Sequence, residues 1–172
     1  MPGEEDTYAS YGHGWANVSN APFRLFKKWN HEGGIATPFI AHWPAGIKAA
    51  GSLRHQPGHV IDIMATAIEL ASASYPEVRD GHAILPLEGI SLVPAFADQP
   101  LEREAIFWEH LGNRAVRAGD WKLVRHGNRP WELYNLAADR IEMNNLARCH
   151  PAEVEHLEAL WNAWAGRSLV AP

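Results

Sequence analysis

A chain of 172 residues has room for one domain or little more, and its 47% hydrophobic and 20% charged residues are typical of a globular chain and argue against disorder. The formal net charge of −5 gives no reason to expect nucleic acid or an anionic membrane as a partner. No apolar run approaches the roughly 20 residues that a membrane helix needs, and the single cysteine, Cys149, excludes an intrachain disulfide.

The first residues, 1–14, are acidic and have no apolar core, so they do not form a signal peptide. This observation does not fix the compartment, because a signal could stand elsewhere if the chain is part of a longer one. The localisation is therefore left unknown, with the cytoplasm and the periplasm of a bacterium both open.

The first half of the chain alternates between irregular and regular patterns. Residues 1–34 show no sustained periodicity and predict a long, packed loop. The short apolar run 37–43 lies between prolines and predicts a buried strand. Residues 59–73 carry apolar side chains at intervals of three and four, which predicts a helix, and the prolines within 77–103 predict loops.

The second half alternates with the period of a strand and then of a helix. The predicted strands are 105–110, 114–117, 121–125 and 131–136. Gly119 and Asp120 form a good hairpin turn between the second and third strands, which indicates antiparallel pairing. Pro151 suits the first turn of a closing helix, whose apolar stripe would cover one face of the sheet.

These elements predict an α/β fold, or α+β for this chain taken alone, with two parts. Residues 1–100 form a first part with one strand and one helix, and residues 101–172 form a small four-stranded antiparallel sheet packed on a C-terminal helix. One strand and one helix cannot close a core, so the first part implies a larger partner body. Apolar surface left bare on residues 1–100 would be a reason for self-association.

One stretch of the chain resembles a known family signature. Lys27 stands five residues before Glu32-Gly33-Gly34, and Pro38 follows shortly after. The spacing resembles that of the sulfatase family, in its arylsulfatase version. Further resemblances, in the family's order, are HVIDIMATAIELASASYP, PLEGISLVPAF, IFWEHLGNRAVRAGDWKLV and WELYNLAADRIEMNNLA.

The resemblance implies a fold and a chemistry. Sulfatases belong to the alkaline-phosphatase-like superfamily, and this chain would be the C-terminal part of such a fold: the tail of the large α/β domain, then the small sheet. In the family a formylglycine attacks the sulfur of a sulfate ester, a calcium ion polarises the sulfate, and Lys and His neutralise developing charge. By position, Lys27 would be a sulfate-binding residue.

The sequence also departs from the family pattern. The formylglycine arises in a Cys-x-Pro-x-Arg motif, but Cys149 has neither Pro two residues later nor Arg four residues later. The family's Asp-Asp and Asp-Asn calcium ligands are missing as well. We therefore expect no catalytic residue and no metal ligand in this chain, and we expect the chain alone to be inactive.

Several further residues are candidates for the site. Glu109, His110 and Asn113 could reach from the small sheet towards a substrate pocket, and His31 could line the pocket or cap the loop. Glu32 could be a general acid or base, but the family resemblance favours a structural carboxylate that holds the loop. Gly33 and Gly34 are expected to permit positive φ or close backbone approach. Lys28 is assigned to a solvated loop, where no function is expected of it. No His or Cys spacing matches a zinc site.

The favoured function is thus the C-terminal part of an arylsulfatase-like enzyme that hydrolyses sulfate esters. Its expected partners are a small-molecule sulfate ester and the N-terminal sulfatase domain that this chain lacks. Two alternatives stay open: a non-catalytic structural or binding domain, and part of a related phosphate or phosphonate ester hydrolase.

Overall fold

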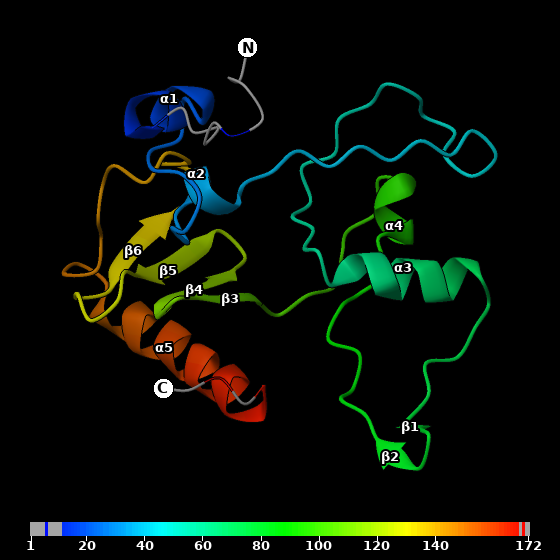
Figure 1. Cartoon of the computed structure of the whole chain (residues 1–172). Helices are drawn as coiled ribbons and strands as arrows, with labels where there is room; N and C mark the ends of the chain where they lie inside the picture. The colour runs from blue at the N-terminus through cyan, green and yellow to red at the C-terminus, as the bar shows by residue number, and fades with distance from the viewer. Residues whose placement is uncertain (1–5, 7–11, 169, 171–172) are drawn as a thin grey trace. The chain divides into compact units, whose positions relative to one another are not determined.

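A computed structural model describes residues 6, 12–168 and 170 of the chain, which forms two compact units (Figure 1). The first unit joins the described residues up to Pro38 with those from Glu104 onward, and the second spans Phe39–Arg103. The boundary at residue 100 expected from the sequence differs from this division, because residues 20–36 pack on the C-terminal sheet. The division into residues 1–100 and 101–172 stays a prediction.

The four-stranded antiparallel sheet of the first unit confirms the sequence-based prediction, in the order β3-β4-β5-β6. Its strands are β3 (Ile106–His110), β4 (Asn113–Ala118), β5 (Trp121–Arg125) and β6 (Glu132–Asn135). Two-residue turns join the first three strands, since His110 pairs with Asn113 and Ala118 pairs with Trp121. Gly112 and Gly119 both have positive φ, as these tight hairpin turns require.

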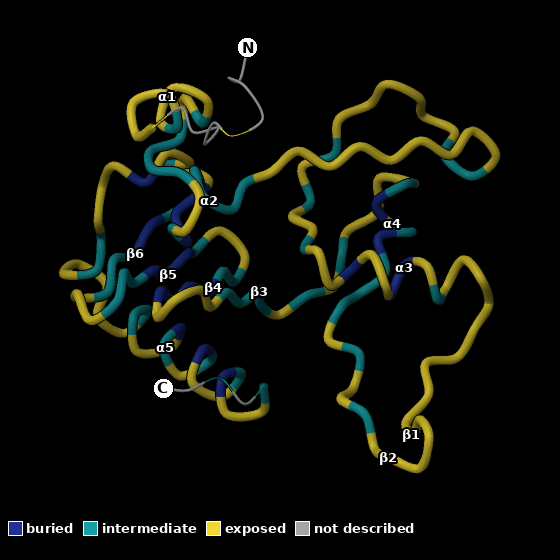
Figure 2. The backbone as a smooth tube through the Cα atoms, in the orientation of Figure 1, coloured by how far each residue is buried: buried dark blue, intermediate teal, exposed yellow. Residues whose placement is uncertain are grey.

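Helix α5 (Pro151–Arg167) covers one face of this sheet, as the apolar stripe predicted (Figure 1). The core between them consists of Val116, Leu123, Leu133, Leu157, Trp161 and Ala165. The indole N–H of Trp161 also donates to the carbonyl of Trp108, at 3.2 Å. Most of the buried residues that the structure describes, dark blue in Figure 2, lie in this sheet and helix.

The opposite face of the sheet mixes apolar and charged side chains. Ala115, Val124, Tyr134 and Leu136 form a second, smaller core there. Residues 20–36 contact this face, and they end in the one-turn helix α2 (Glu32–Ile35). Helix α1 (Gly12–Ser19) precedes them, so the prediction of an irregular loop over 1–34 is wrong for both helices. Residues 1–5 and 7–11 of that predicted loop lie outside the described residues.

The second unit is built around α3 (Asp62–Leu70), which confirms the predicted helix with shorter bounds. Two short strands, β1 (Val78–Arg79) and β2 (His82–Ala83), and the single turn α4 (Val93–Phe96) follow. Asp62 is fully buried and holds the unit together: its carboxylate accepts from the backbone N–H of His59 and of Ile90 and pairs with Arg103.

The predicted buried strand at 37–43 is wrong within this structure. These residues have no regular structure, and Ile40 is 88% exposed. A strand needs a neighbouring strand to accept its hydrogen bonds, and no described residue of the chain pairs with this segment.

The apolar stripe at α3 is also bare, since Val60, Ile63 and Met64 are each more than half exposed (Figure 2). No described helix is long and apolar enough to span a membrane.

Candidate functional site

Lys27 lies at the tip of a tight turn in the first unit. The N–H of Trp29 donates to the carbonyl of Phe26 at 3.1 Å, so Lys27 and Lys28 are the two central residues of a four-residue turn. Both lysines are exposed. Lys28 has a φ of 85°, the positive value that the third residue of a type II turn requires, and Leu25 has a φ of 68°. The two lysines therefore lie in a tight turn and not in an extended segment.

The two glycines after Glu32 allow this turn to fold back on the chain. A Cβ at Gly33 would lie 2.2 Å from the carbonyl oxygen of Arg24, and one at Gly34 would lie 2.0 Å from that of Trp29. No real Cβ contact is that short. Of the two expected roles, the structure shows close backbone approach, and neither glycine has positive φ.

Asn113, at the start of β4, holds the residues just after Lys27. Its side-chain amide donates to the carbonyl of Lys28 at 2.8 Å, and its own carbonyl accepts from the side chain of Asn30 at 2.9 Å. Its side-chain oxygen accepts from the N–H of Gly127 at 3.1 Å. Asn113 and Asn30 are both buried, so these hydrogen bonds fix the backbone next to Lys27.

A buried lysine holds the residues after the turn. Lys122 on β5 is fully buried, and its Nζ lies 2.9 Å from Glu32 and 2.8 Å from Glu142. Glu142 in turn accepts from the backbone N–H of Glu32 at 2.8 Å, and Arg140 pairs with the second oxygen of Glu32 at 2.9 Å. Glu32 and Glu142 thus face Lys122 and Arg140, and Arg117 also interacts electrostatically with Glu32.

The pKa of Glu32 reflects this balance. Burial raises the pKa of the Glu32 carboxyl, but Lys122 and then Arg140 outweigh burial, so the pKa lies below its ordinary value. An ionised carboxylate committed to two cations cannot act as a general acid or base. The geometry therefore agrees with the expected structural role of Glu32.

A second charged cluster lies beside the first, on β6. One carboxylate oxygen of Glu132 lies 3.0 Å from Arg24, 3.0 Å from Nε2 of His31 and 2.6 Å from the hydroxyl of Tyr134, which donates to it. These partners, with the hydrogen bond to His31 the largest influence, lower the pKa of Glu132 to about 2. Burial, together with Glu132, raises the pKa of Tyr134.

The candidate pocket residues have different positions. His31 is buried and fixed to Glu132, and Asn113 is buried and fixed to the turn. Glu109 and His110 are exposed at the end of β3, where Glu109 accepts from the N–H of Gly112. The structure thus brings His31 and Asn113 to the segment that carries Lys27. That any of the four lines a substrate pocket stays a prediction.

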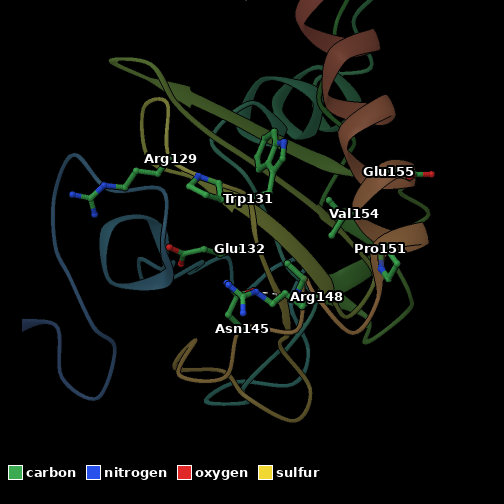
Figure 3. Close-up of a pocket in the computed structure, with 10 residues that line it drawn as sticks. Arg129, Trp131, Glu132, Asn145, Arg148, Pro151, Val154 and Glu155 are labelled. Carbon is green, nitrogen blue, oxygen red and sulfur yellow. Dashed lines mark hydrogen bonds between the residues drawn. The ribbon is translucent and has the colours of Figure 1, made fainter.

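A shallow groove of about 620 Å³ lies between the start of β6 and the first turns of α5 (Figure 3). Its lining residues are Arg129, Pro130, Trp131, Glu132, Asn145, Ala147, Arg148, Pro151, Val154 and Glu155. Two of these residues are arginines and two are glutamates, and Glu132 is paired with Arg24, from outside the lining.

The described residues do not fit a calcium ion or a formylglycine. No three of their His, Cys, Asp or Glu side chains gather as a metal site would need. The buried carboxylates Glu32, Glu142 and Asp62 are each committed to Lys or Arg. Cys149 is exposed, just before α5. The absence of metal ligands and nucleophile from the chain stays a prediction.

The residues that hold the turn were not predicted from the sequence: they are Arg24, Lys122, Glu132, Tyr134, Arg140 and Glu142. One signal was present. Lys122 stands in β5 at a position whose neighbours on the same face, such as Val124, are buried. A lysine at an inward position of a strand demands an anionic partner. Nothing in the sequence identified Glu32 and Glu142 as those partners, because they lie far from it in the chain.

Comparison with known proteins places these features in a family. The family model described as "N-sulphoglucosamine sulphohydrolase, C-terminal" matches residues 22–162. An uncharacterized sulfatase of Schizosaccharomyces pombe is 33% identical over 92% of this chain and 30% of its own length. The N-acetylgalactosamine-6-sulfatase of Sus scrofa is 36% identical over 75% of this chain and 24% of its own length.

Solved structures agree with this likeness. The crystal structure of Ps i-CgsB superposes with a TM-score of 0.68 at 25% identity, over 86% of this chain and 33% of that chain. The same protein in complex with k-i-k-neocarrahexaose superposes with a TM-score of 0.60 at 26% identity, over 73% and 28%. The chain thus spans about a third or less of the length of each of these relatives.

Proposed function

The chain belongs to the C-terminal domain family of the sulfatases, and from that premise we propose that it completes the active site of an enzyme that hydrolyses sulfate esters. We call the sulfatase that contains these 172 residues the complete enzyme. In it, the ammonium of Lys27 binds the sulfate group and neutralises charge that develops on its oxygens in the transition state. The nucleophile and the metal ligands come from outside this chain.

The observation that supports this proposal is the construction of the Lys27 turn. Two non-glycine residues with positive φ, Leu25 and Lys28, flank Lys27. Such conformations cost on the order of 1–3 kcal/mol each and persist where the surroundings force them, most often at functional sites. Here the surroundings are Glu32, Gly33 and Gly34, because the backbone of the two glycines lies against residues 24–29. This packing accounts for the spacing between Lys27 and Glu32. A compact ammonium presented at a turn tip suits a tetrahedral oxyanion.

The chemistry of cofactors is assigned to the missing part of the enzyme. Sulfatase relatives use calcium and a formylglycine, and these supply the electrophilic and nucleophilic groups when present. We assign neither group to the residues described in this chain. Its own contribution is to bind and orient the sulfate through Lys27.

The missing part would also cover the second unit. Ile40, Val60 and Met64 are among its exposed apolar side chains. Large apolar patches on a protein surface mark sites of association, and we propose that these side chains contribute to one. The N-terminal sulfatase domain is the partner that the family supplies, and it would give residues 37–43 a strand to pair with.

An activity assay tests the proposal. The complete enzyme should release sulfate from 4-nitrophenyl sulfate or from a sulfated sugar, and it should prefer both to 4-nitrophenyl phosphate and to a phosphonate monoester. A preference for the phosphorus esters would support the related hydrolase instead. No turnover of any ester by a folded complete enzyme would support a non-catalytic domain.

The 172-residue chain alone should show no turnover of the same aryl sulfate, with or without calcium. The reason is that removing the nucleophile leaves only residual catalysis by binding groups. Turnover of roughly 1 per second or faster, the range of ordinary enzymes, would contradict the assignment of the nucleophile to another part of the protein.

A further inference from the structure

The turn that carries Lys27 cannot hold its own conformation. Leu25 and Lys28 have φ values of 68° and 85°, which non-glycine residues adopt at a cost. One backbone hydrogen bond, from Trp29 to Phe26, closes the turn. Contacts from outside the turn must therefore offset the free-energy cost of the positive φ values at Leu25 and Lys28.

Those contacts come from the C-terminal sheet. Asn113 on β4 fixes the carbonyl of Lys28, directly after Lys27. Lys122 on β5 fixes Glu32, and Glu32 fixes the two glycines whose backbone lies against residues 24–29. The turn is thus held at two points, one by a neutral hydrogen bond and one by a buried ion pair.

The Lys122 contact is the stronger of the two. Lys122 is fully buried between two carboxylates, and pairs of opposite charge interact more strongly away from water than at the surface. Removing one partner from a buried pair leaves the other charge uncompensated, so the pair does not open easily. The ammonium also lies on the sheet face opposite to α5, where it can fix the loop without disturbing the core between sheet and helix.

We infer that Lys122 is a positioning residue for catalysis: with Glu142 it clamps Glu32 and thereby holds the strained turn that presents Lys27 to the sulfate group. The inference rests on the proposed function of Lys27. It assigns to the small C-terminal sheet a part in the reaction, because a buried cation of the sheet determines where the sulfate-binding ammonium lies.

A double-mutant cycle in the complete enzyme tests the link between the two lysines. Lys122→Met keeps the length of the side chain and removes its charge, and should lower kcat/KM at least about tenfold. If Lys122 acts through Lys27, the double variant Lys122→Met/Lys27→Ala should lie within about threefold of Lys27→Ala alone. If the double variant instead loses kcat/KM by the product of the two single-variant losses, the inference is overturned.

Leu123→Ala is the matched control for a purely structural effect. Leu123 is the next residue of β5, equally buried, but it faces α5. Its truncation leaves a cavity and lowers the Tm. At a temperature where both variants are folded, Leu123→Ala should change kcat/KM by less than about threefold. A loss of activity equal to that of Lys122→Met would show that Lys122 acts only through stability.

Amide hydrogen exchange separates this inference from the proposed function. The Trp29 amide closes the turn, so its exchange should accelerate at least about tenfold in Lys122→Met and remain near wild type in Leu123→Ala. Unchanged exchange in Lys122→Met would overturn the inference. Accelerated exchange with no kinetic effect of Lys27→Ala would confirm the clamp and contradict the proposed role of Lys27. Lys122→Arg, which keeps the charge but misplaces it, replaces Lys122→Met in every arm if the latter does not fold.

Discussion

At the scale of single residues, the contacts of Glu32, Gly33 and Gly34 explain why these residue types stand together in the sequence. Glu32 is ionised and buried between Lys122 and Arg140, and the adjacent glycines lie against the carbonyl groups of residues 24–29. The motif is therefore a device for folding a loop back on itself at the face of a sheet. The chemistry that we propose belongs to Lys27, at the other end of that loop.

The glycine requirement gives the first prediction. Gly34→Ala should lower the free energy of unfolding by on the order of 2 kcal/mol, because the new Cβ would overlap the carbonyl oxygen of Trp29 and force the backbone to move. Urea unfolding of the 172-residue chain measures it. Gly166→Ala in α5 is the control, since nothing lies within 4 Å of that site and alanine favours a helix. Equal stability of the Gly34 variant and wild type would mean that this close approach does not exist.

The glycines also show what the sequence could and could not predict at this scale. The family resemblance predicted that Glu32 holds the loop, and the local pair Gly33-Gly34 predicted either positive φ or close backbone approach, of which the structure shows the second. The partners of that carboxylate were not predictable, since Lys122 and Glu142 lie about a hundred residues away and meet Glu32 only in the folded chain. The turn at Lys27 was also missed, because neither Leu25 nor Lys28 is a residue type that favours positive φ.

At the scale of elements, strong local periodicity predicted strands and helices correctly, whereas an isolated apolar run did not. The strands around Gly112 and Gly119 form as predicted, because alternation and tight turns fix their register within a few residues. Helix α5 is stabilised because its apolar side chains pack against the adjacent sheet. Residues 37–43 have the composition of a buried strand but no described partner, and composition alone cannot supply the missing hydrogen bonds.

The contact between β6 and residues 24–31 depends on pH. Glu132 has a pKa of about 2 in the folded chain against an ordinary value of 4.5, so its ionised form stabilises the fold above about pH 4.5. We expect that contribution, on the order of 1 to 2 kcal/mol for a partly exposed group, to disappear as the pH falls from 4.5 towards 2. Urea unfolding of wild type and of Glu132→Gln at several pH values measures it. The two stability curves should converge at low pH, and a constant difference between them from pH 7 to pH 2 would refute the assignment.

At the scale of the whole molecule, the two units differ in how well they bury their apolar surface. The first has two cores on the two faces of its sheet. The second leaves Ile40, Leu53 and Val60 at least 70% exposed. This difference is what a C-terminal sulfatase domain would show if its second unit packs against the remainder of the enzyme.

The exposed surface predicts self-association of the 172-residue chain. At concentrations of about 100 µM, where exposed apolar surface promotes association, it should sediment as oligomers and bind a hydrophobic dye. Ile40→Ser/Val60→Ser should reduce both, whereas His156→Ser, an exposed polar position on α5, should reduce neither. A monomer that binds no dye at that concentration would mean that these side chains are covered within the chain itself.

The most direct test of the account compares Lys27 with Lys28 in the complete enzyme. The two are adjacent, exposed and central to the same turn, so each variant removes one exposed positive charge from that turn. Lys27→Ala should lower kcat/KM for an aryl sulfate by on the order of 10²-fold or more, the loss expected when a group that stabilises transition-state charge is removed. Lys28→Ala should lower it by less than about threefold, the effect of an exposed charge. Equal losses for the two variants would contradict the assignment of Lys27 to the sulfate-binding site.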